Sequence, residues 1–402
     1  MSKWIETELG KIIDIKHGWA FKGEFFACKG DLIVVTPGNF IEEGGFRVRE
    51  GKEKFYTGDF PNEFLLKKDD LIIAMTEQGA GLLGSPALIT EDNKFLHNQR
   101  IGLFQNYKSE QISKKYLYYL FFTQYVRGII SGSATGTKVK HTAPKRIYSI
   151  KIKLPPLPTQ KKIAKILSNY DDLIENNLKR IKLLEESARL TYEEWFLRFR
   201  IDGVKLDIDS ETGLPYGWET KKLGDCVNNF DNKRKPLSAF IREKRKGKIP
   251  YYGAASILDY IDDYIFDGKY LLLGEDGTVI TKQGSPMLQF INCKFWVSNH
   301  AHILTGKLIS TELLYLILNI YPISNHITGA AQPKINQQNL NRIILSIPND
   351  LVLKKFDLIV IPIFKLIFKL QNQNQRLKEA RDILLPRLMT GIIDTENMDI
   401  KL

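Results

Sequence analysis

The chain has 402 residues, and its 58 Lys and Arg against 46 Asp and Glu leave a formal charge of +12. This length exceeds what one compact core usually fills, and the basic balance favours a polyanionic partner, although many basic proteins bind no nucleic acid. The three cysteines lie far apart and form no CxxC pair, which argues against a zinc site or a disulfide framework.

The N-terminal residues and the longest uncharged stretch indicate the cellular compartment that we expect for the protein. The N-terminus is charged from the outset and lacks the apolar core of a signal peptide. The stretch from Leu313 to Pro333 carries no acidic or basic charge, but Pro322 and several polar side chains argue against a membrane span. We therefore expect a cytoplasmic protein with no membrane partner.

An internal repeat organises the chain. The segment that begins at Trp4 returns at Trp218, and Gly84-Ser85-Pro86 returns at Gly284-Ser285-Pro286. We also pair Asn98 with Asn299. Further along, a constant spacing joins several pairs: Pro155 with Pro348, Lys161-Lys162 with Lys354-Lys355, Leu184 with Leu377, and Glu186 with Glu379.

Each half combines short β-rich runs with one amphipathic helix. Taken along the chain, we expect a strand over Leu71–Met75, a helix over Lys114–Ile130, a strand over Tyr270–Leu273 and a helix over Ser310–Ile320. The fold class is α+β, with two pseudo-repeated recognition domains joined by two long antiparallel helices. The expected division is residues 1–157, a first spacer helix 158–200, residues 201–349, and a second spacer helix with a tail 350–402.

Apolar residues recur at a spacing of 3.5 in both spacer helices, as in a coiled coil. Asn177 interrupts one series, and Asn374 and Arg381 interrupt another. Antiparallel pairing with Ile163 opposite Leu388 places Asn177 opposite Asn374, where a mutual amide hydrogen bond would fix the register. The alternative is two independently solvated asparagines. The coil positions include Leu167, Ile174, Ile181, Trp195, Ile367, Leu377 and Leu384.

Two features of these helices have further consequences. Pro362 is expected to bend the second helix. A coil from Ile163 to Trp195 would be about 48 Å long at 1.5 Å per residue. Two heads held that far apart would meet sites separated by somewhat more than one turn of duplex DNA, roughly 34–36 Å, so a bipartite target with an unread gap is expected.

Basic and amide-rich segments are the candidate DNA contacts, because such groups bind phosphates and base edges. Alternatives remain open: a polar loop before a strand, a solvated surface loop, or a surface ion pair for Arg100. The candidates are Asn98, Gln99, Arg100, Thr135, Thr137, Lys138, Lys140, Lys145, Lys233, Arg234, Lys235, Arg242, Gln332, Lys334 and Asn336.

Catalytic and metal-binding signatures are missing from the sequence. His97, His300 and His302 have no carboxylate or cysteine partner at a suitable spacing, so no metal site is predicted. None of the 16 prolines is followed by Asp, as a PD-(D/E)xK nuclease requires, and neither a phosphate-binding P-loop nor an amino-methyltransferase motif occurs. A non-catalytic chain is expected.

The sequence resembles the specificity subunit of a type I restriction-modification enzyme along essentially its whole length. The resemblance is carried by Leu154-Pro-Pro-Leu-Pro-Thr-Gln160-Lys-Lys-Ile163, Trp195-Phe196 with Phe199, Gly213-Leu-Pro-Tyr-Gly217-Trp218 and Leu384-Leu-Pro386-Arg-Leu-Met-Thr390-Gly391. It implies two domains that each read half of an asymmetric split duplex DNA target. It also implies docking of two methyltransferase subunits and of restriction subunits in a prokaryotic cytoplasm.

The resemblance assigns no cofactor to this chain. S-adenosylmethionine, ATP and Mg would be bound by the partner subunits. The aromatic cluster Trp195, Phe196 and Phe199 is either an anchor for a partner or the packing of the coil end onto the second domain. Two other functions stay open: a stand-alone bipartite DNA-binding regulator, and a basic coiled-coil scaffold.

Overall fold

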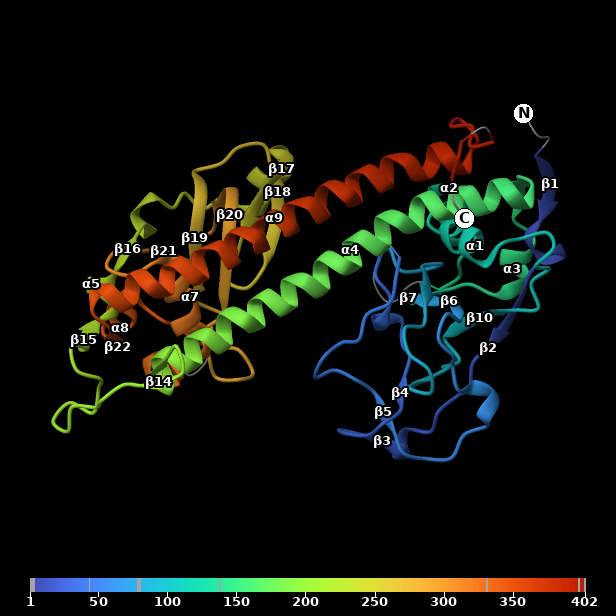
Figure 1. Ribbon diagram of the computed structural model, residues 1–402. Coiled ribbons are helices and arrows are strands. Elements are labelled where there is room, and N and C mark those ends of the chain that lie inside the picture. Colours follow the sequence, from blue (N-terminus) through green and yellow to red (C-terminus); the bar gives the residue numbers. More distant parts are fainter. Residues whose placement is uncertain are drawn as a thin grey trace. The chain divides into compact units, whose positions relative to one another are not determined.

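The computed structural model describes residues 4–42, 44–77, 81–136, 139–329, 332–396 and 398–400. The chain divides into two compact units, one of residues 1–174 with 376–402, and one of residues 175–375. We call them unit 1 and unit 2 and describe each by itself (Figure 1). Among the described residues, no helix combines the length and the apolarity needed to cross a membrane.

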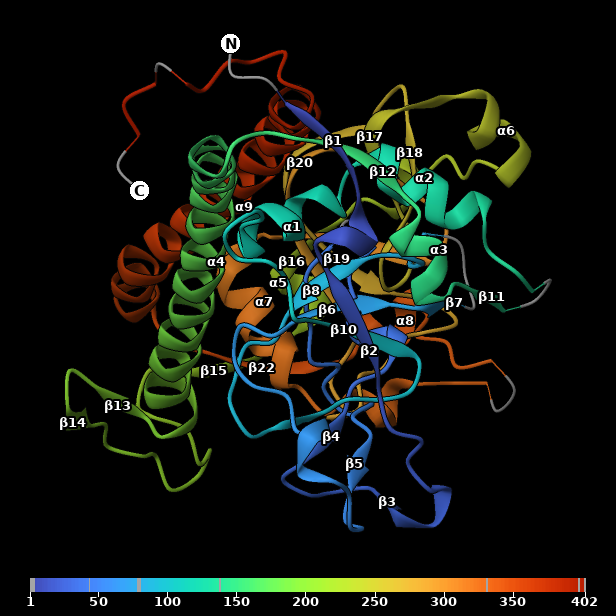
Figure 2. The same cartoon turned by 90° about the vertical axis from the view of Figure 1, so that its right-hand side faces the viewer.

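Unit 1 is built on an antiparallel sheet of four strands in the order β2-β10-β6-β8 (Figure 2). Strands β1 and β12 pair antiparallel, and a second sheet of four short strands has the order β3-β5-β4-β9. The strands are β1 Ile5–Glu8, β2 Asp14–His17, β3 Phe26–Ala27, β4 Ile33–Val34, β5 Phe55–Tyr56, β6 Leu71–Ala74, β7 Thr76–Glu77, β8 Pro86–Leu88, β9 Phe95–Leu96, β10 Ile101–Gln105, β11 Lys140–His141 and β12 Lys151–Leu154. The short helices are α1 Lys114–Leu120, α2 Gln124–Gly132 and α3 Pro144–Tyr148.

Unit 2 has a larger sheet of six strands in the order β16-β21-β19-β20-β17-β18, and its strands β15 and β22 form a separate antiparallel pair. The strands are β13 Arg200–Ile201, β14 Val204–Lys205, β15 Glu219–Lys222, β16 Val227–Asn229, β17 Lys246–Tyr252, β18 Ile257–Ile261, β19 Phe266–Gly274, β20 Leu288–Val297, β21 Ala301–Gly306 and β22 Ile344–Ile347. The short helices are α5 Leu223–Cys226, α6 Ala239–Lys244, α7 Thr311–Ile320 and α8 Gln337–Asn341.

The two units repeat one plan. In unit 1, β10 pairs with both β2 and β6, and in unit 2, β21 pairs with both β16 and β19. The pair β1–β12 corresponds to β15–β22, and one long helix follows each of these pairs. The predicted repeat and the α+β class are therefore confirmed.

The helix expected over 114–130 is wrong as a single element. The structure has two helices, α1 and α2, separated by residues 121–123. Thr123 has an extended backbone, and its hydroxyl accepts a hydrogen bond from the Val126 amide, which makes it the N-cap of a new helix. Its counterpart α7 is continuous and begins after the N-cap Ser310.

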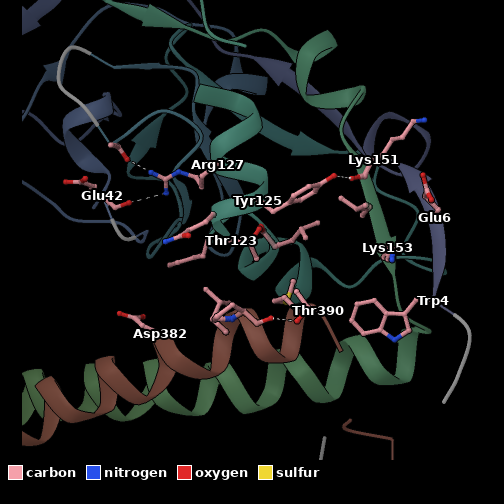
Figure 3. A pocket seen from close by; sticks show the side chains of 18 residues that line it. Trp4, Glu6, Glu42, Thr123, Tyr125, Arg127, Lys151, Lys153, Asp382 and Thr390 are labelled. Carbon is pink, nitrogen blue, oxygen red and sulfur yellow. Dashed lines mark hydrogen bonds between the residues drawn. The ribbon is translucent and has the colours of Figure 1, made fainter. Parts of the chain in front are cut away.

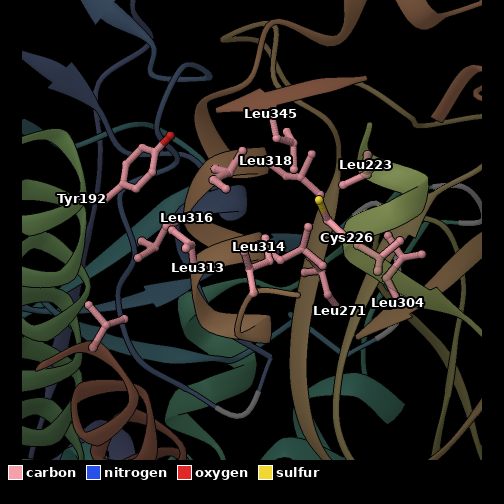
Figure 4. Packing of buried hydrophobic residues seen from close by; sticks show 14 of the residues in the cluster. Tyr192, Leu223, Cys226, Leu271, Leu304, Leu313, Leu314, Leu316, Leu318 and Leu345 are labelled. Carbon is pink, nitrogen blue, oxygen red and sulfur yellow. The ribbon is translucent and has the colours of Figure 1, made fainter. Parts of the chain in front are cut away.

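Apolar packing against α7 forms the core of unit 2 (Figure 4). The largely apolar helix α7 buries Leu313, Leu314 and Leu318 completely, together with Leu271 and Leu304 of the sheet. Because a helix that is apolar nearly all round must be covered on several sides, α7 lies between the sheet and residues of the long helices.

The two spacer helices are α4 Leu157–Tyr192 and α9 Asp350–Met389. A short π-helical segment, Glu193–Leu197, continues α4. The segments of α4 and α9 within each unit pack antiparallel: Ile163 and Leu388 share the core of unit 1, and Asn177 donates from Nδ2 to Asn374 Oδ1 at 2.9 Å in unit 2. The predicted pairing of the two asparagines is confirmed, and both side chains are buried.

Arg381, which breaks the apolar series of the second helix, also has a partner. Its guanidinium donates to Asp171 Oδ1 at 2.7 Å, and the hydroxyl of Tyr119 donates to Asp171 Oδ2 at 2.6 Å. Burial opposes the positive charge, but these carboxylate contacts outweigh it and raise the pKa of Arg381. A coil position of unit 1 is therefore an ion pair instead of an apolar contact.

The helix α9 continues through Pro362, which is exposed. Proline removes the hydrogen bond that its amide would donate to the carbonyl of residue 358. Leu358 is 78% exposed, so that carbonyl lies on the face of the helix next to solvent, where loss of the bond is tolerated.

The aromatic cluster at the end of α4 is covered by the chain itself. Trp195 and Phe196 are 5% and 6% exposed, and their rings lie 5.6 and 4.9 Å from the ring of Phe356. Phe196 and Phe199 also contact Trp218 at 5.4 and 5.5 Å. Of the two interpretations of this cluster, packing of the coil end onto the second domain is the one observed.

The asparagine pair makes a testable prediction. Replacing Asn177 by leucine removes the donor to Asn374 Oδ1, so we expect the free energy of unfolding to fall by about 1–3 kcal/mol. Replacing both asparagines by leucine should restore it to the wild-type value or above, because an apolar pair has no polar group to desolvate. Urea unfolding of the full chain measures both effects. A more stable Asn177→Leu chain would contradict a register role for the pair.

Candidate nucleic-acid interface

Three segments that are distant in sequence meet beside β6 in unit 1. The Met75 amide donates to the Arg100 carbonyl at 3.0 Å, and the Thr142 amide donates to the Met75 carbonyl at 3.0 Å. The turn before β11 is closed by hydrogen bonds between Thr135 and His141. We call residues 75–77, 98–100 and 135–142 the first rim; of these, residues 137 and 138 lie outside the described part of the chain.

Unit 2 repeats this frame bond for bond. The Glu275 amide donates to the His300 carbonyl at 2.8 Å, and the Ile335 amide donates to the Glu275 carbonyl at 2.8 Å. Thr328 and Lys334 close the corresponding turn. We call residues 275–277, 298–300 and 328–336, without the undescribed 330–331, the second rim. The predicted correspondence of the loops near 135 and 328 is thereby confirmed.

Glycine shapes both turns. Gly136 has φ 101° and Gly329 has φ 86°, a region that side-chain-bearing residues rarely adopt. A Cβ on either residue would lie within 2.4 Å of a backbone oxygen, that of Val139 or Gln332. The backbone therefore turns tightly here and brings its polar groups to the surface.

Several of the predicted contact residues carry exposed side chains on these rims. On the rims these are Gln99, Arg100, Thr135, Lys140, Gln332 and Lys334, while Lys145, Lys233 and Lys235 are exposed on segments outside the rims. Cationic and amide groups on a surface can approach phosphates and base edges. Thr137 and Lys138, also predicted, lie outside the described residues.

Two predicted contact residues use their amide groups within the fold. Asn98 is 9% exposed, and its Oδ1 accepts from the Arg100 amide at 2.9 Å. Asn336 is the N-cap of α8 and accepts from the Asn339 amide at 2.8 Å. These side chains stabilise the rims that present their neighbours.

The pairing of Asn98 with Asn299 is wrong by one residue. The partner of Asn98 in the repeat is Ser298, whose Oγ accepts from the His300 amide at 3.2 Å. The hydrogen-bonding role is kept while the residue type changes, which is why a search for identical residues selected the adjacent asparagine.

Arg234 and Arg242 are also committed to internal contacts. Arg234 is 16% exposed and donates to Glu275 Oε2 at 2.6 Å and to the Ala301 carbonyl at 3.0 Å. Arg242 is 18% exposed, donates to the Leu237 carbonyl at 2.7 Å and lies over the Tyr251 ring. The geometry gives both guanidinium groups a structural role.

His302 has carboxylate partners, and they come from segments distant in sequence, where a search at short spacing does not find them. Asp231 Oδ2 lies 2.5 Å and Glu275 Oε2 lies 3.8 Å from His302 Nδ1, and these three residues are grouped closely enough to suggest a metal site. However, Arg234 and Lys334 lie 2.6 and 3.3 Å from the Glu275 carboxylate. Because cations of the chain already occupy this carboxylate, the group is an ion-pair network and fits a metal poorly.

The buried histidine of unit 1, His97, has no ion-pair network of the kind described for His302 among the residues that the structure describes. His97 is fully buried, and burial lowers its pKa to about 4. Its Nε2 lies 2.9 Å from the Ile101 carbonyl. It is therefore a neutral core histidine, as the absence of partners in its sequence neighbourhood suggests.

A cavity of about 1000 Å³ lies within unit 1, between α2, the β1–β12 pair and the end of α9 (Figure 3). The Tyr125 hydroxyl donates to the Lys151 carbonyl at 2.8 Å on one wall, and Arg127 contacts the carbonyls of Glu42 and Gly81. Thr390 lies across the cavity from Tyr125 (Figure 3), and Pro386 also lines the cavity. Pro386 and Thr390 belong to the C-terminal segment that carries part of the family resemblance.

The architecture of the chain and its similarity to known proteins indicate the same class of protein. Two copies of one α+β domain, each followed by a long helix that pairs with the other, define a duplicated recognition chain. The family model described as the type I restriction modification DNA specificity domain matches residues 1–186 and 215–373. The chain therefore belongs to the type I restriction-modification specificity subunits, which are non-catalytic.

Individual relatives agree with this family. The chain is 28% identical over 311 residues to the type I restriction enzyme MjaIX specificity subunit of Methanocaldococcus jannaschii, covering 71% of each chain. It is 23% identical to the HindI specificity subunit of Haemophilus influenzae over 98% of this chain and all of the relative. The crystal structure of a type I S subunit from M. genitalium has the same fold, with a TM-score of 0.59, 16% identity and 96% of both chains covered.

Proposed function

We propose that each unit of this specificity subunit reads one half of a split duplex DNA target through its rim. The observation that carries the proposal is the repeated frame: equivalent amide-to-carbonyl bonds build both rims, and both present exposed lysine and glutamine side chains. Lysine binds phosphate, and glutamine can read an adenine edge. Different side chains on one frame support different base preferences in the two halves.

The long helices support a second part of the proposal, docking of two methyltransferase subunits and of restriction subunits. Leu183 and Leu190, which are seven residues apart and share one face of α4, are 69% and 42% exposed. Leu178 of the same helix is 56% exposed, so α4 exposes much apolar surface. The cavity beside Pro386 and Thr390 is a further concave surface for a partner. S-adenosylmethionine, ATP and Mg would be bound by these partners.

Co-expression with the host's methyltransferase subunit, followed by sequencing of modified adenines on a plasmid, tests the proposal. We expect methylation of one split motif with a fixed unread gap. Methylation that is absent with this chain present, or that follows a continuous motif, would contradict it. Full specific DNA affinity of the chain without any partner would favour the stand-alone regulator.

The alternative function, a basic coiled-coil scaffold, makes a different prediction. A scaffold that binds acidic proteins has no sequence preference on DNA. Competition between the methylated motif and a duplex with both halves scrambled separates the two functions, since only a reader of bases prefers the motif.

A further inference from the structure

The ion-pair network around His302 lies behind the second rim. The imidazole is 1% exposed, and both of its nitrogens face oxygen acceptors: Nδ1 is 2.5 Å from Asp231 Oδ2, and Nε2 is 2.8 Å from the Ile335 carbonyl. A neutral imidazole has one N–H and can donate to only one of them. With Asp231 as an ionised carboxylate, both contacts are hydrogen bonds only when His302 is an imidazolium cation.

The two acceptors belong to two different surface segments. Ile335 lies between Lys334 and Asn336 on the second rim, whereas Asp231 precedes the basic residues Lys233 and Lys235. Asp231 Oδ1 also accepts from the Ile303 amide at 2.9 Å, which fixes the carboxylate to β21. The cationic ring therefore joins the glutamine- and lysine-bearing loop to the basic segment through one strand.

The charged groups that face His302 come from every neighbouring segment. Arg234 lies 2.6 Å and Lys334 lies 3.3 Å from Glu275, while the Arg234–Asp231 distance is longer, at 3.7 Å. Glu275 is thus matched by two cations, and Asp231 is the counter-ion of the imidazolium. The neighbouring His300 contacts Asp276 through Nδ1, and its side chain is 47% exposed.

We propose that His302 is a positioning residue which, as an imidazolium, holds both DNA-contacting segments of unit 2 in one arrangement and makes recognition of that half-site dependent on pH. The inference rests on the proposed function of the second rim. It adds a residue that touches no DNA itself and acts through Asp231 and Ile335.

The pKa values give the direction of this dependence. Burial alone would lower the pKa of His302, but the hydrogen bond and negative charge of Asp231 outweigh it, and the pKa lies above the ordinary value. The stabilisation is therefore full below about pH 6.5 and is lost as the pH rises through the raised pKa. Burial would raise the pKa of Asp231, yet the His302 contact lowers it, so the carboxylate stays charged until strongly acidic pH.

Unit 1 lacks this device and serves as an internal control. Ile101 pairs with Ala74 as Ala301 pairs with Gly274, so Gly102 occupies the position of His302. A Cβ on Gly102 would lie 2.7 Å from Ile15 and 2.9 Å from Ile73, which leaves no space for a ring. Recognition by unit 1 should therefore show no such step.

The first experiment follows the protonation of His302 directly. Nitrogen-15 histidine labelling of the full chain, with NMR from about pH 6 to about pH 9, compares wild type with His302→Gln to assign the resonance. We expect a doubly protonated imidazole above the ordinary histidine pKa. A His302 that is neutral at pH 7 overturns the inference, whatever the chain does on DNA.

The second experiment uses the assembled methyltransferase complex and the duplex whose split motif is modified. Discrimination against a base change in the half read by unit 2 should fall by about tenfold as the pH rises, which corresponds to about 1.4 kcal/mol. In the His302→Gln chain, this discrimination should be low and should not change across the pH range. His326→Gln, another histidine of unit 2, whose ring contacts the Tyr321 hydroxyl, should keep the step.

Discrimination at the half-site read by unit 1 serves two purposes. It shows whether the variant chain is folded, and in wild type it tests the proposed function. If wild type reads neither half, the proposed function fails. If His302→Gln still reads the first half normally, the chain is folded; an unchanged second half with its pH step intact then overturns the role of His302 alone.

Discussion

Replacing Phe356 by alanine is expected to lower the free energy of unfolding by about 3–5 kcal/mol, the range for truncating a buried aromatic residue. Phe356 is fully buried where α9 meets the end of α4, and its ring contacts those of Trp195 and Phe196. The cavity would open between the two long helices inside unit 2. Urea unfolding followed by circular dichroism measures the change.

Leu358→Ala is the matched control for that substitution. It removes an apolar side chain from the same helix two residues away, but Leu358 is 78% exposed, so a change within about 0.5 kcal/mol is expected. Equal effects of the two substitutions would contradict the placement of Phe356 in the core and the orientation of α9 around its axis.

Removing four exposed lysines among the predicted contact residues, one of them on the first rim, is expected to have the largest effect on DNA binding. A chain with Lys140, Lys145, Lys233 and Lys235 replaced by alanine should bind the target on the order of 100-fold more weakly at moderate salt. Each phosphate contact contributes about 0.9 to the slope of log affinity against log salt, so the slope should become shallower by about 3 to 4. Binding titrations at several salt concentrations give both quantities.

The control carries the same change of charge at lysines away from the predicted DNA contacts. Lys29 and Lys68 in unit 1, with Lys205 and Lys307 in unit 2, are exposed lysines that are not among the predicted contact residues. Their replacement by alanine alters the net charge equally and should leave the salt slope nearly unchanged. Matching slopes in the two variants would mean that overall charge, instead of the predicted contact lysines, binds DNA.

The repeat and the helical register were accessible from the sequence because both depend on periodicity. A constant spacing between matched residues follows wherever no insertion occurs, and it holds from β12 and β22 through the long helices. The heptad pattern placed Asn177 opposite Asn374 because the antiparallel partner of a coil position follows from one matched pair.

Other features depend on tertiary contacts that no local pattern encodes. Arg234 resembles its basic neighbours in sequence, but Glu275, 41 residues away, takes its guanidinium inside the fold. His302 meets Asp231 across 71 residues, so a search for ligands at short spacing could not find the network. The break at Thr123 was missed because apolar periodicity continues across it, and only the capping hydroxyl marks a new helix.

Exchange of residues 1–150 for those of a relative with another target tests the central claim most directly. Modified adenines would be sequenced from cells that carry the exchanged chain with the same methyltransferase subunit. The account predicts that one half of the split motif changes while the other half, read by unit 2, and the unread gap stay as they were. A change in both halves, or in neither, would contradict the assignment of one half-site to each unit.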